Sequence, residues 1–256
     1  NLNELNTYEY KQSKFAFPNI ENTHVSEATY YRFFIDQYLP SKIETLIYLD
    51  ADIVCVSDPL DDIKYEIKEL KNSDFIISAR LENESLNKKL KLKSANYFNA
   101  GVMIIDKKRW IKNDIGKKLV KITSERHQDL EFWDQDSLNI LFDGNFCHMS
   151  KFLNFNLNMY PYENVINYEL DKNVKFIHYF GKFKPWTLKG IENKKTKYYQ
   201  NFYRQIYKEK YHLNDNWKVN TIKDLFKIIF TGKILKIRYP FSLIFLTVQF
   251  LFRNKK

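Results

Sequence analysis

Two carboxylates one residue apart interrupt an apolar run in the first quarter of the chain. The run Leu46–Val54 reads Leu-Ile-Tyr-Leu-Asp-Ala-Asp-Ile-Val, so Asp50 and Asp52 follow residues typical of a buried strand. In an extended chain residues i and i+2 point to the same side, which would bring both side chains together at the carboxyl end of the strand. Carboxylate oxygens suit Mg²⁺ or Mn²⁺, which commonly hold a substrate diphosphate. A lone Asp-x-Asp is more often the start of an Asp-rich turn, so its neighbours decide its meaning.

Polar side chains also gather where a second apolar segment begins. In Phe132–Leu141, Asp134, Gln135 and Asp136 precede apolar residues at helical spacing. Polar residues at a helix entry often cap the free backbone N–H groups, and capping is the simplest interpretation. Side-chain amides in such a cluster can also bind the hydroxyl groups of a sugar.

A third cluster follows a strand in the second half of the chain. The segment His178–Trp186 contains a histidine at the strand end, then Gly181 and Lys184. An imidazole could complete a metal site begun by two carboxylates, a glycine permits close backbone approach, and a lysine is a compact cation suited to phosphate. A single histidine is more often structural. Together the three clusters supply metal ligands, a phosphate-binding cation and sugar-binding amides, which is what a nucleotide-sugar enzyme requires.

The elements that would position these clusters alternate between helix and strand. In chain order, the pattern predicts a helix over 28–35, strand 46–50, a turn and helix start at 56–60, strand 74–79, strand 97–106 and a helix opening at Trp110. The first helix stops before Pro40 and would bring Arg32 close to the following strand. Residues 82–95 are rich in Lys, Asn and Glu, which predicts a mobile surface loop. We therefore predict an α/β fold with a Rossmann-like, mostly parallel sheet and flanking helices.

Composition indicates a folded protein with a basic bias. The chain has 256 residues, 44% hydrophobic residues and a net charge of +10, enough for one large α/β domain. Cys55 and Cys147 are isolated thiols, a pattern that fits a reducing cytoplasm. The five histidines are too scattered for a zinc signature, and the start at Asn1 has neither a basic segment nor an apolar segment of a secretory signal.

On these residues the chain resembles glycosyltransferase family 8, which includes bacterial lipopolysaccharide α-galactosyl- and α-glucosyltransferases and, more distantly, glycogenin. The resemblance covers nearly all of residues 23–190 and rests on four motifs in family order: Asp50-Ala51-Asp52, Phe98-Asn99-Ala100-Gly101-Val102, Asp134-Gln135-Asp136, and His178 to Trp186. Each motif is weak alone, but four at family-like spacing are a strong signal.

The resemblance implies a GT-A type fold and a retaining transfer of galactose or glucose from UDP-galactose or UDP-glucose to a lipopolysaccharide, lipooligosaccharide or related glycan or glycolipid. It implies that Asp50, Asp52 and His178 hold Mn²⁺, or Mg²⁺ in its place. The implied donor-binding residues are Arg32, Asp50, Ala51, Asp52, Asn99, Gly101, His178, Gly181 and Lys184. Asp134 and Gln135 are the implied catalytic residues, facing the transferred sugar or the acceptor.

The amino end departs from the family pattern. Family members begin with a βαβ unit that grips the uracil and ribose, and this chain has no matching segment, so we expect about 60 to 70 residues upstream. Two alternatives stay open. In the first, the chain is an inactive truncated relative that binds carbohydrate or lipid. In the second, the Asp-x-Asp motif is that of a haloacid dehalogenase-type phosphatase. The second is disfavoured because the later Gly-Asp-x-x-x-Asp motif is missing.

The carboxyl end has its own character, which divides the chain into a catalytic domain over 1–217 and a tail over 218–256. The tail carries nine Lys or Arg against one acid, Asp224, a net charge of +8. Its 14-residue apolar run Tyr239–Phe252 is shorter than the roughly 20 residues of a spanning helix. Flanked by basic residues, it predicts an anchor on the anionic inner face of the cytoplasmic membrane; a core helix is the alternative. No nucleic-acid recognition motif accompanies the charge.

Overall fold

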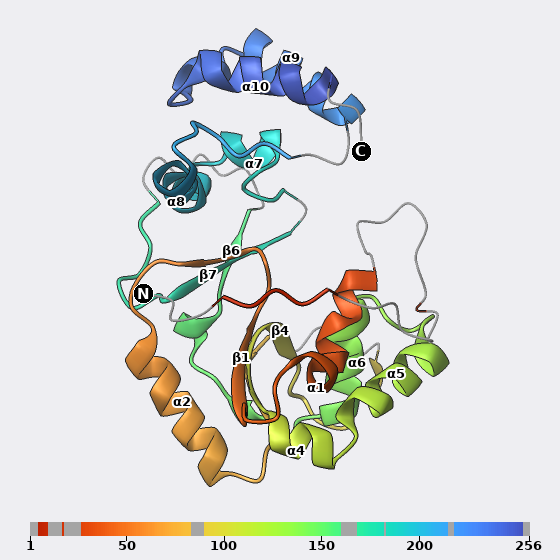
Figure 1. Cartoon of the computed structure of the whole chain (residues 1–256). Coiled ribbons are helices and arrows are strands. Elements are labelled where there is room, and N and C mark those ends of the chain that lie inside the picture. The colour runs from red at the N-terminus through yellow and green to blue at the C-terminus, as the bar shows by residue number, and fades with distance from the viewer. Residues whose placement is uncertain are drawn as a thin grey trace. The chain divides into compact units, whose positions relative to one another are not determined.

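The computed structural model describes residues 5–9, 17, 27–82, 90–159, 168–181, 183–214 and 218–252 (Figure 1). The chain forms two compact units. Unit 1 comprises residues 1–51 and 59–154, and unit 2 comprises residues 52–58 and 155–256. Half of the segment 82–95 predicted as a mobile loop, residues 83–89, lies outside the described residues.

Unit 1 is an α/β unit built on a mixed sheet. Its elements are η1 (Glu27–Phe34), α1 (Ile35–Tyr38), β1 (Thr45–Leu49), α2 (Leu60–Asn72), β3 (Ile77–Leu81), β4 (Phe98–Asp106), α4 (Lys107–Lys112), α5 (Ile115–Arg126), α6 (Trp133–Phe142), β5 (Cys147–His148) and η3 (Lys151–Leu153). The described strands are ordered β1-β4-β3-β5. β4 is antiparallel to both β1 and β3, and β3 is parallel to β5.

The α/β prediction is confirmed, but the expectation of a mostly parallel sheet is wrong for the described strands. β1 and β3 run in the same direction, as a β-α-β unit requires, because both pair antiparallel with β4. β4 inserts between them and reverses the local pairing. The β-α-β order along the chain predicts that two successive strands run in the same direction. It does not predict whether a later strand inserts between them in the sheet.

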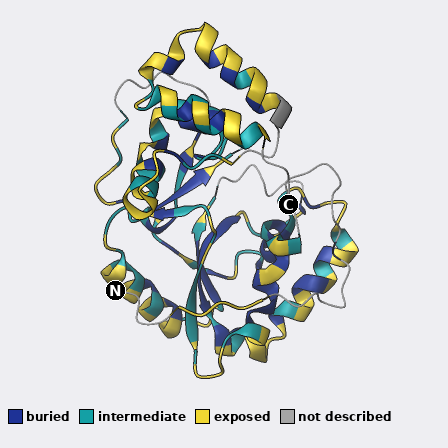
Figure 2. Ribbon diagram, turned by 45° about the horizontal axis from the view of Figure 1, so that its top comes forward, coloured by how far each residue is buried: buried dark blue, intermediate teal, exposed yellow. Residues whose placement is uncertain are grey.

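The central position of β4 explains its composition. Every residue from Phe98 to Ile105 is buried, since the strand has a neighbour on each edge and helices over the sheet (Figure 2). Its side chains join those of η1, α4, α5 and α6 in one hydrophobic core that includes Phe33, Trp110 and Leu138. The predicted helix over 28–35 is present, but Glu27–Phe34 forms a 3₁₀ helix and only Ile35–Tyr38 is α-helical.

Unit 2 has a small sheet and a helical layer. Its elements are β2 (Ile53–Cys55), β6 (Phe155–Asn158), β7 (Phe176–Phe180), α7 (Leu188–Glu192), η4 (Lys194–Thr196), α8 (Lys197–Tyr207), α9 (Lys218–Phe230), η5 (Lys233–Lys236) and α10 (Pro240–Phe252). The described strands are ordered β2-β7-β6, with β2 antiparallel and β6 parallel to β7.

The helices of the predicted tail share a core with the rest of unit 2. Leu225 of α9, Ile234 of η5 and Leu243 of α10 pack with Leu188 of α7 and with Tyr211. One side of each tail helix is therefore a core element, as the alternative interpretation predicted. None of the described helices is long and apolar enough to cross a membrane.

Candidate functional site

The Asp50-Ala51-Asp52 motif lies in a turn and not in an extended strand. β1 ends at Leu49 and β2 begins at Ile53, so the geometric reason for expecting the two carboxylates on one side does not apply. Asp50 belongs to unit 1 and Asp52 to unit 2. The backbone N–H of Asp50 donates to the carbonyl of Gly101 at 2.9 Å, which fixes the end of β1 against β4, and Ala51 is exposed.

Arg32 joins three parts of unit 1 at one buried point. Its Nη2 donates to Asp50 Oδ1 at 2.7 Å, its Nε pairs with Asp134 Oδ2 at 2.8 Å, and its Nη1 donates to the carbonyl of Ala100 at 2.7 Å. The guanidinium lies 4.1 Å from the centre of the Tyr48 ring. The prediction that the first helix brings Arg32 to the strand is confirmed. Its contact with a donor remains a prediction, because these bonds are internal.

The charges of this cluster do not cancel, since one cation faces two carboxylates. Burial raises the pKa of Asp134 to about 6 although Arg32 opposes the shift, so the carboxyl is still ionised at neutral pH. Burial would lower the pKa of Arg32, but Asp134 and Asp50 raise it above its ordinary value. Burial raises the pKa of Tyr48, which keeps its proton and donates to Asp50 Oδ1 at 2.6 Å. The cluster therefore has a surplus of negative charge.

Asp136 binds the backbone of the segment that precedes α6. Its Oδ2 accepts hydrogen bonds from the backbone N–H groups of Glu131 and Phe132 at 2.6 and 2.8 Å. Its Oδ1 accepts a hydrogen bond from the hydroxyl of Tyr97 at 2.5 Å. Asp136 therefore fixes the segment that leads into α6, but the N-cap residue Phe132 makes no side-chain capping bond, so the capping interpretation is not confirmed for this helix.

Gln135 is held against β4 by its own side chain. Its Oε1 accepts from the backbone N–H of Ala100 at 3.0 Å, and its Nε2 donates to the Tyr97 hydroxyl at 3.0 Å. One turn later, Asn139 pairs with both backbone groups of Phe98, accepting at 2.8 Å and donating at 2.9 Å. These amides fix α6 on the strand that carries Asn99 and Gly101.

Asn99 is buried and fully engaged inside unit 1. Its Oδ1 accepts from the backbone N–H of Gly101 at 3.0 Å and from Asn154 Nδ2 at 2.9 Å. Its Nδ2 donates to Glu82 Oε2 at 3.2 Å. The structure therefore gives the Phe98–Val102 motif a structural role, and a donor contact by Asn99 stays a prediction.

Unit 2 places Asp52, His178 and Lys184 together. Asp52 Oδ2 accepts from Lys184 Nζ at 2.6 Å, and Asp52 Oδ1 lies 3.5 Å from His178 Nε2. His178 is the middle residue of β7 and pairs with Ile53 of β2, which explains the approach. Lys184 also donates to the carbonyl of Tyr179 at 2.7 Å.

The return of the chain from β7 to Lys184 depends on two glycines. Gly181 has a φ of +98°, a conformation that residues with a Cβ rarely adopt. Gly190 of α7 lies against the carbonyl of Lys184 so closely that a Cβ there would overlap it. Thr187 caps α7 through Gly190 N–H at 3.0 Å, and its own N–H donates to the Lys184 carbonyl at 3.0 Å.

The Asp52–His178 pair fits a divalent cation. Asp52 Oδ1 is buried and has no hydrogen-bond partner among the described residues. An unpaired buried carboxylate oxygen is costly unless an ion or a donor completes it. Two ligands about 2.1 Å from an ion and about 90–110° apart are separated by roughly 3.0–3.4 Å, close to the observed 3.5 Å. The second oxygen of Asp52 is already held by Lys184, so the free oxygen is oriented.

Sequence reasoning missed three residues that build this region. Tyr48 contacts Arg32 through its ring and donates a hydrogen bond to Asp50. Tyr97 accepts a hydrogen bond from Gln135 and donates one to Asp136. Asn139 binds the backbone of β4. Tyr48 stands two residues before Asp50, so strand alternation could have placed it on the same face. Tyr97 and Asn139 act through long-range bonds that no local pattern indicates.

The chain belongs to glycosyltransferase family 8, whose model matches residues 3–190. It is similar to the lipopolysaccharide 1,3-galactosyltransferase of Salmonella typhimurium, with 32% identity over 166 residues, 62% of this chain and 49% of the relative. It is also similar to a lipopolysaccharide 1,2-glucosyltransferase of Escherichia coli, with 31% identity over 61% of this chain and 49% of the relative. The chain thus spans about half the length of the curated relatives it matches.

Solved structures place the fold in the same class. The crystal structure of galactosyltransferase LgtC in complex with donor and acceptor sugar analogues superposes with a TM-score of 0.53 at 26% identity, covering 67% of this chain and 64% of LgtC. An active-site variant of LgtC, with a glutamine replaced by glutamate, gives 0.51 at 25% identity. The prediction of an α/β fold of the GT-A type is confirmed, and the phosphatase alternative is not supported.

Proposed function

We propose that this chain carries the catalytic region of a retaining hexosyltransferase, which transfers galactose or glucose from a UDP-sugar to a lipopolysaccharide or related glycan acceptor. The observation that carries the proposal is the Asp52–His178–Lys184 cluster, a candidate cation site and a lysine in a chain of family 8. The names of its relatives support the two hexoses and the acceptor class.

We propose that Asp50, Asp52 and His178 hold a divalent cation, Mn²⁺ or Mg²⁺. Oxygen and imidazole ligands suit both ions, and Asp50 stands two residues before Asp52 in the chain. When bound, such an ion neutralises charge on a departing diphosphate. Lys184 would add a second positive charge near the departing diphosphate, since its ammonium group is held at Asp52 by a 2.6 Å contact.

For catalysis we propose Gln135 and Asp134 as the residues that orient the transferred sugar. Gln135 has negligible basicity and is bonded to Ala100 and Tyr97, so it is suited to position a group and not to attack it. Asp134 is buried and paired with Arg32, which makes it a poor nucleophile. We therefore favour attack by the acceptor hydroxyl on the face of the leaving diphosphate, assisted by its oxygen, over a covalent glycosyl-enzyme. Arg32, Ala51, Asn99, Gly101 and Gly181 complete the proposed donor-binding set.

We propose that residues 1–217 form the catalytic part and that 218–256 attach it to the anionic cytoplasmic face of the membrane. Exposed positions are frequent on the described tail helices (Figure 2), and many of them carry apolar side chains: Ile222, Phe226, Ile229, Phe230, Leu235, Phe241, Phe245, Val248 and Phe252. Exposed Lys223 and Lys227 lie among them on α9. Apolar and basic residues on one surface are typical of an interfacial anchor.

Lys184→Gln tests the proposed chemistry. We expect a higher KM for the UDP-sugar and a lower kcat, with kcat/KM reduced about 100-fold, because a cation near the leaving group acts on binding and on the developing charge. UDP release from UDP-galactose and UDP-glucose with Mn²⁺ measures it. Lys172→Gln, an exposed lysine of the same unit, is the control and should match the parent chain. Unchanged kinetics for Lys184→Gln would remove its role, and no UDP release by the parent chain would favour a binding protein.

The double substitution Phe241→Ser and Phe245→Ser tests membrane attachment. These side chains are 83% and 67% exposed, so their loss should leave the core of unit 2 intact. We expect roughly 100-fold weaker binding to anionic vesicles, also at high salt, since burying a Phe contributes about 1.5–3 kcal/mol. Co-sedimentation with vesicles measures it, and Leu60→Ser with Ile111→Ser, exposed in unit 1, is the control. Equal sedimentation of both variants contradicts the proposal.

A further inference from the structure

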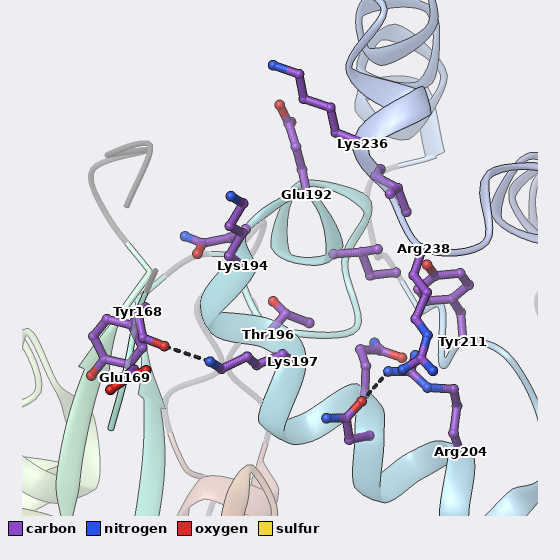
Figure 3. A pocket seen from close by; sticks show the side chains of 15 residues that line it. Tyr168, Glu169, Glu192, Lys194, Thr196, Lys197, Arg204, Tyr211, Lys236 and Arg238 are labelled. Carbon is purple, nitrogen blue, oxygen red and sulfur yellow. Dashed lines mark hydrogen bonds between the residues drawn. The ribbon is translucent and has the colours of Figure 1, made fainter. Parts of the chain in front are cut away.

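An open cavity of about 460 Å³ lies within unit 2, and none of the candidate metal ligands lines it (Figure 3). Its lining comes from residues 168–169, 191–204, 211 and 236–238. Cations outnumber acids in that lining: Lys194, Lys197, Arg204, Lys236 and Arg238 against Glu169 and Glu192. Glu192 is already paired with Lys233 at 2.5 Å, so the surplus is larger than the count suggests.

Two arginines stand side by side at one end of this cavity. Figure 3 shows the guanidinium groups of Arg204 and Arg238 next to each other beside the Tyr211 ring. Both also line a second hollow, together with Asn201 and Tyr239. Burial and the nearby charge of Arg238 lower the pKa of Arg204, and the opposing groups among the described residues are Tyr211 and Tyr239 and not carboxylates.

The partners of Arg204 within the described part of the chain are neutral. Its Nη1 donates to the carbonyl of Lys210 at 3.1 Å, and its Nη2 donates to Asn201 Oδ1 at 2.5 Å. The guanidinium lies 5.8 Å from the centre of the Tyr239 ring, and that of Arg238 lies 5.2 Å from the same ring. Aromatic rings hold both groups in place, so the pair is preorganised.

A phosphate group suits such a pair best. Two guanidinium groups repel each other, and an anion with several oxygens relieves the repulsion while accepting bidentate hydrogen bonds from each fork. A carboxylate offers only two oxygens and one charge. The lysines on the cavity lining add further positive charge for a phosphate and none of the specificity.

The position of the pair in the chain indicates where that phosphate comes from. Arg238 lies between η5 and α10, and exposed Leu235 and Phe241 flank it at three residues on each side, 79% and 83% exposed. A segment that inserts these side chains into a lipid surface brings Arg238 to the depth of the headgroups.

We propose that Arg204 and Arg238 bind the headgroup phosphate of an anionic phospholipid; this rests on the proposed membrane attachment and adds a defined lipid site to it. The site would add recognition of a headgroup phosphate to the general attraction between the basic tail and an anionic membrane. The phosphate contact and the apolar insertion then act together to hold unit 2 at the membrane.

Co-sedimentation of the full chain with vesicles rich in phosphatidic acid tests the site. We expect Arg204→Gln with Arg238→Gln to weaken binding about tenfold or more, and the loss should persist at high salt because paired guanidinium–phosphate bonds are screened less than surface charges. The matched control, Lys223→Gln with Lys227→Gln, removes the same charge from α9, and its loss should disappear as salt rises. Arg238→Gln alone, at an exposed position, should show the same salt-resistant loss if the double variant does not fold.

Three results would overturn the proposal. The arginine and lysine pairs losing affinity equally at every salt concentration would mean that only net charge matters. Full binding by the arginine variants, while Phe241→Ser with Phe245→Ser releases the chain, would leave membrane attachment standing without this site. Binding of inorganic phosphate that depends on the arginines, with vesicle binding that does not, would assign the site to a free phosphate.

Discussion

Asp52→Asn is expected to abolish Mn²⁺-supported sugar transfer, by at least about 100-fold in kcat/KM, while the chain keeps its fold. Asp52 Oδ1 is a buried oxygen without a hydrogen-bond partner in the described structure, and an amide at this position loses both the charge and the affinity for a hard cation. The Lys184 contact at Oδ2 is lost with it. UDP release with Mn²⁺ gives the activity, and calorimetric titration with Mn²⁺ alone gives the cation affinity.

The control for this experiment is Asp58→Asn, an exposed carboxylate of the same unit, which should keep both activity and Mn²⁺ binding. Asp50→Asn and His178→Ala should weaken Mn²⁺ binding as Asp52→Asn does. Full activity of the parent chain in EDTA, or unchanged Mn²⁺ affinity in Asp52→Asn, would contradict the assignment of a metal to this cluster.

Arg32→Gln is expected to lower the free energy of unfolding by about 3–5 kcal/mol, because it leaves the buried carboxylate of Asp134 and the partly buried carboxylate of Asp50 without their cation. The parent guanidinium makes three contacts of 2.7–2.8 Å, with Asp50, Asp134 and the Ala100 carbonyl. Arg32→Lys should recover only part of the loss, since an ammonium cannot reproduce the planar fork. Urea unfolding followed by circular dichroism measures both variants.

Arg126→Gln is the matched control, since its ion pair with Asp129 is partly exposed on both sides and should contribute little. A loss for Arg32→Gln no larger than that of Arg126→Gln would mean that Asp50 and Asp134 do not depend on Arg32. Such a result would leave Arg32 with the proposed donor-binding role alone.

The fold was predictable where local pattern decides it. The strand β4 was expected because its residues form a continuous apolar run, which is typical of a strand buried on both faces. The helix that carries Arg32 was expected because apolar residues recur at helical spacing before Pro40, which ends the pattern. The direction of pairing was not predictable, since the insertion of β4 between β1 and β3 is a long-range choice. Strand β3 begins at Ile77, three residues later than expected. The local sequence pattern did not separate Asp74 and Phe75 from the strand that follows them.

The candidate site was predictable in its residue types and only partly in its contacts. Asp52, His178 and Lys184 were expected to act together, and in the structure His178 Nε2 lies 3.5 Å and Lys184 Nζ lies 2.6 Å from the Asp52 carboxylate. The bonds of Asn99 and Gln135 to the protein were not expected, because their partners Asn154 and Tyr97 are 55 and 38 residues away. Local spacing indicates which groups are available, and tertiary packing decides which of them are already occupied.

The close approach of Gly190 to the Lys184 carbonyl has a consequence for sequence divergence. A single methyl group at position 190 would collide with the backbone that carries Lys184, so even Gly190→Ala requires the 184–187 turn to move. We therefore expect the lysine and the glycine to be kept or lost together, although only the lysine carries charge. In a related chain, a side chain at the position of Gly190 would mark a turn that has been rebuilt and a cation that no longer stands beside its carboxylate.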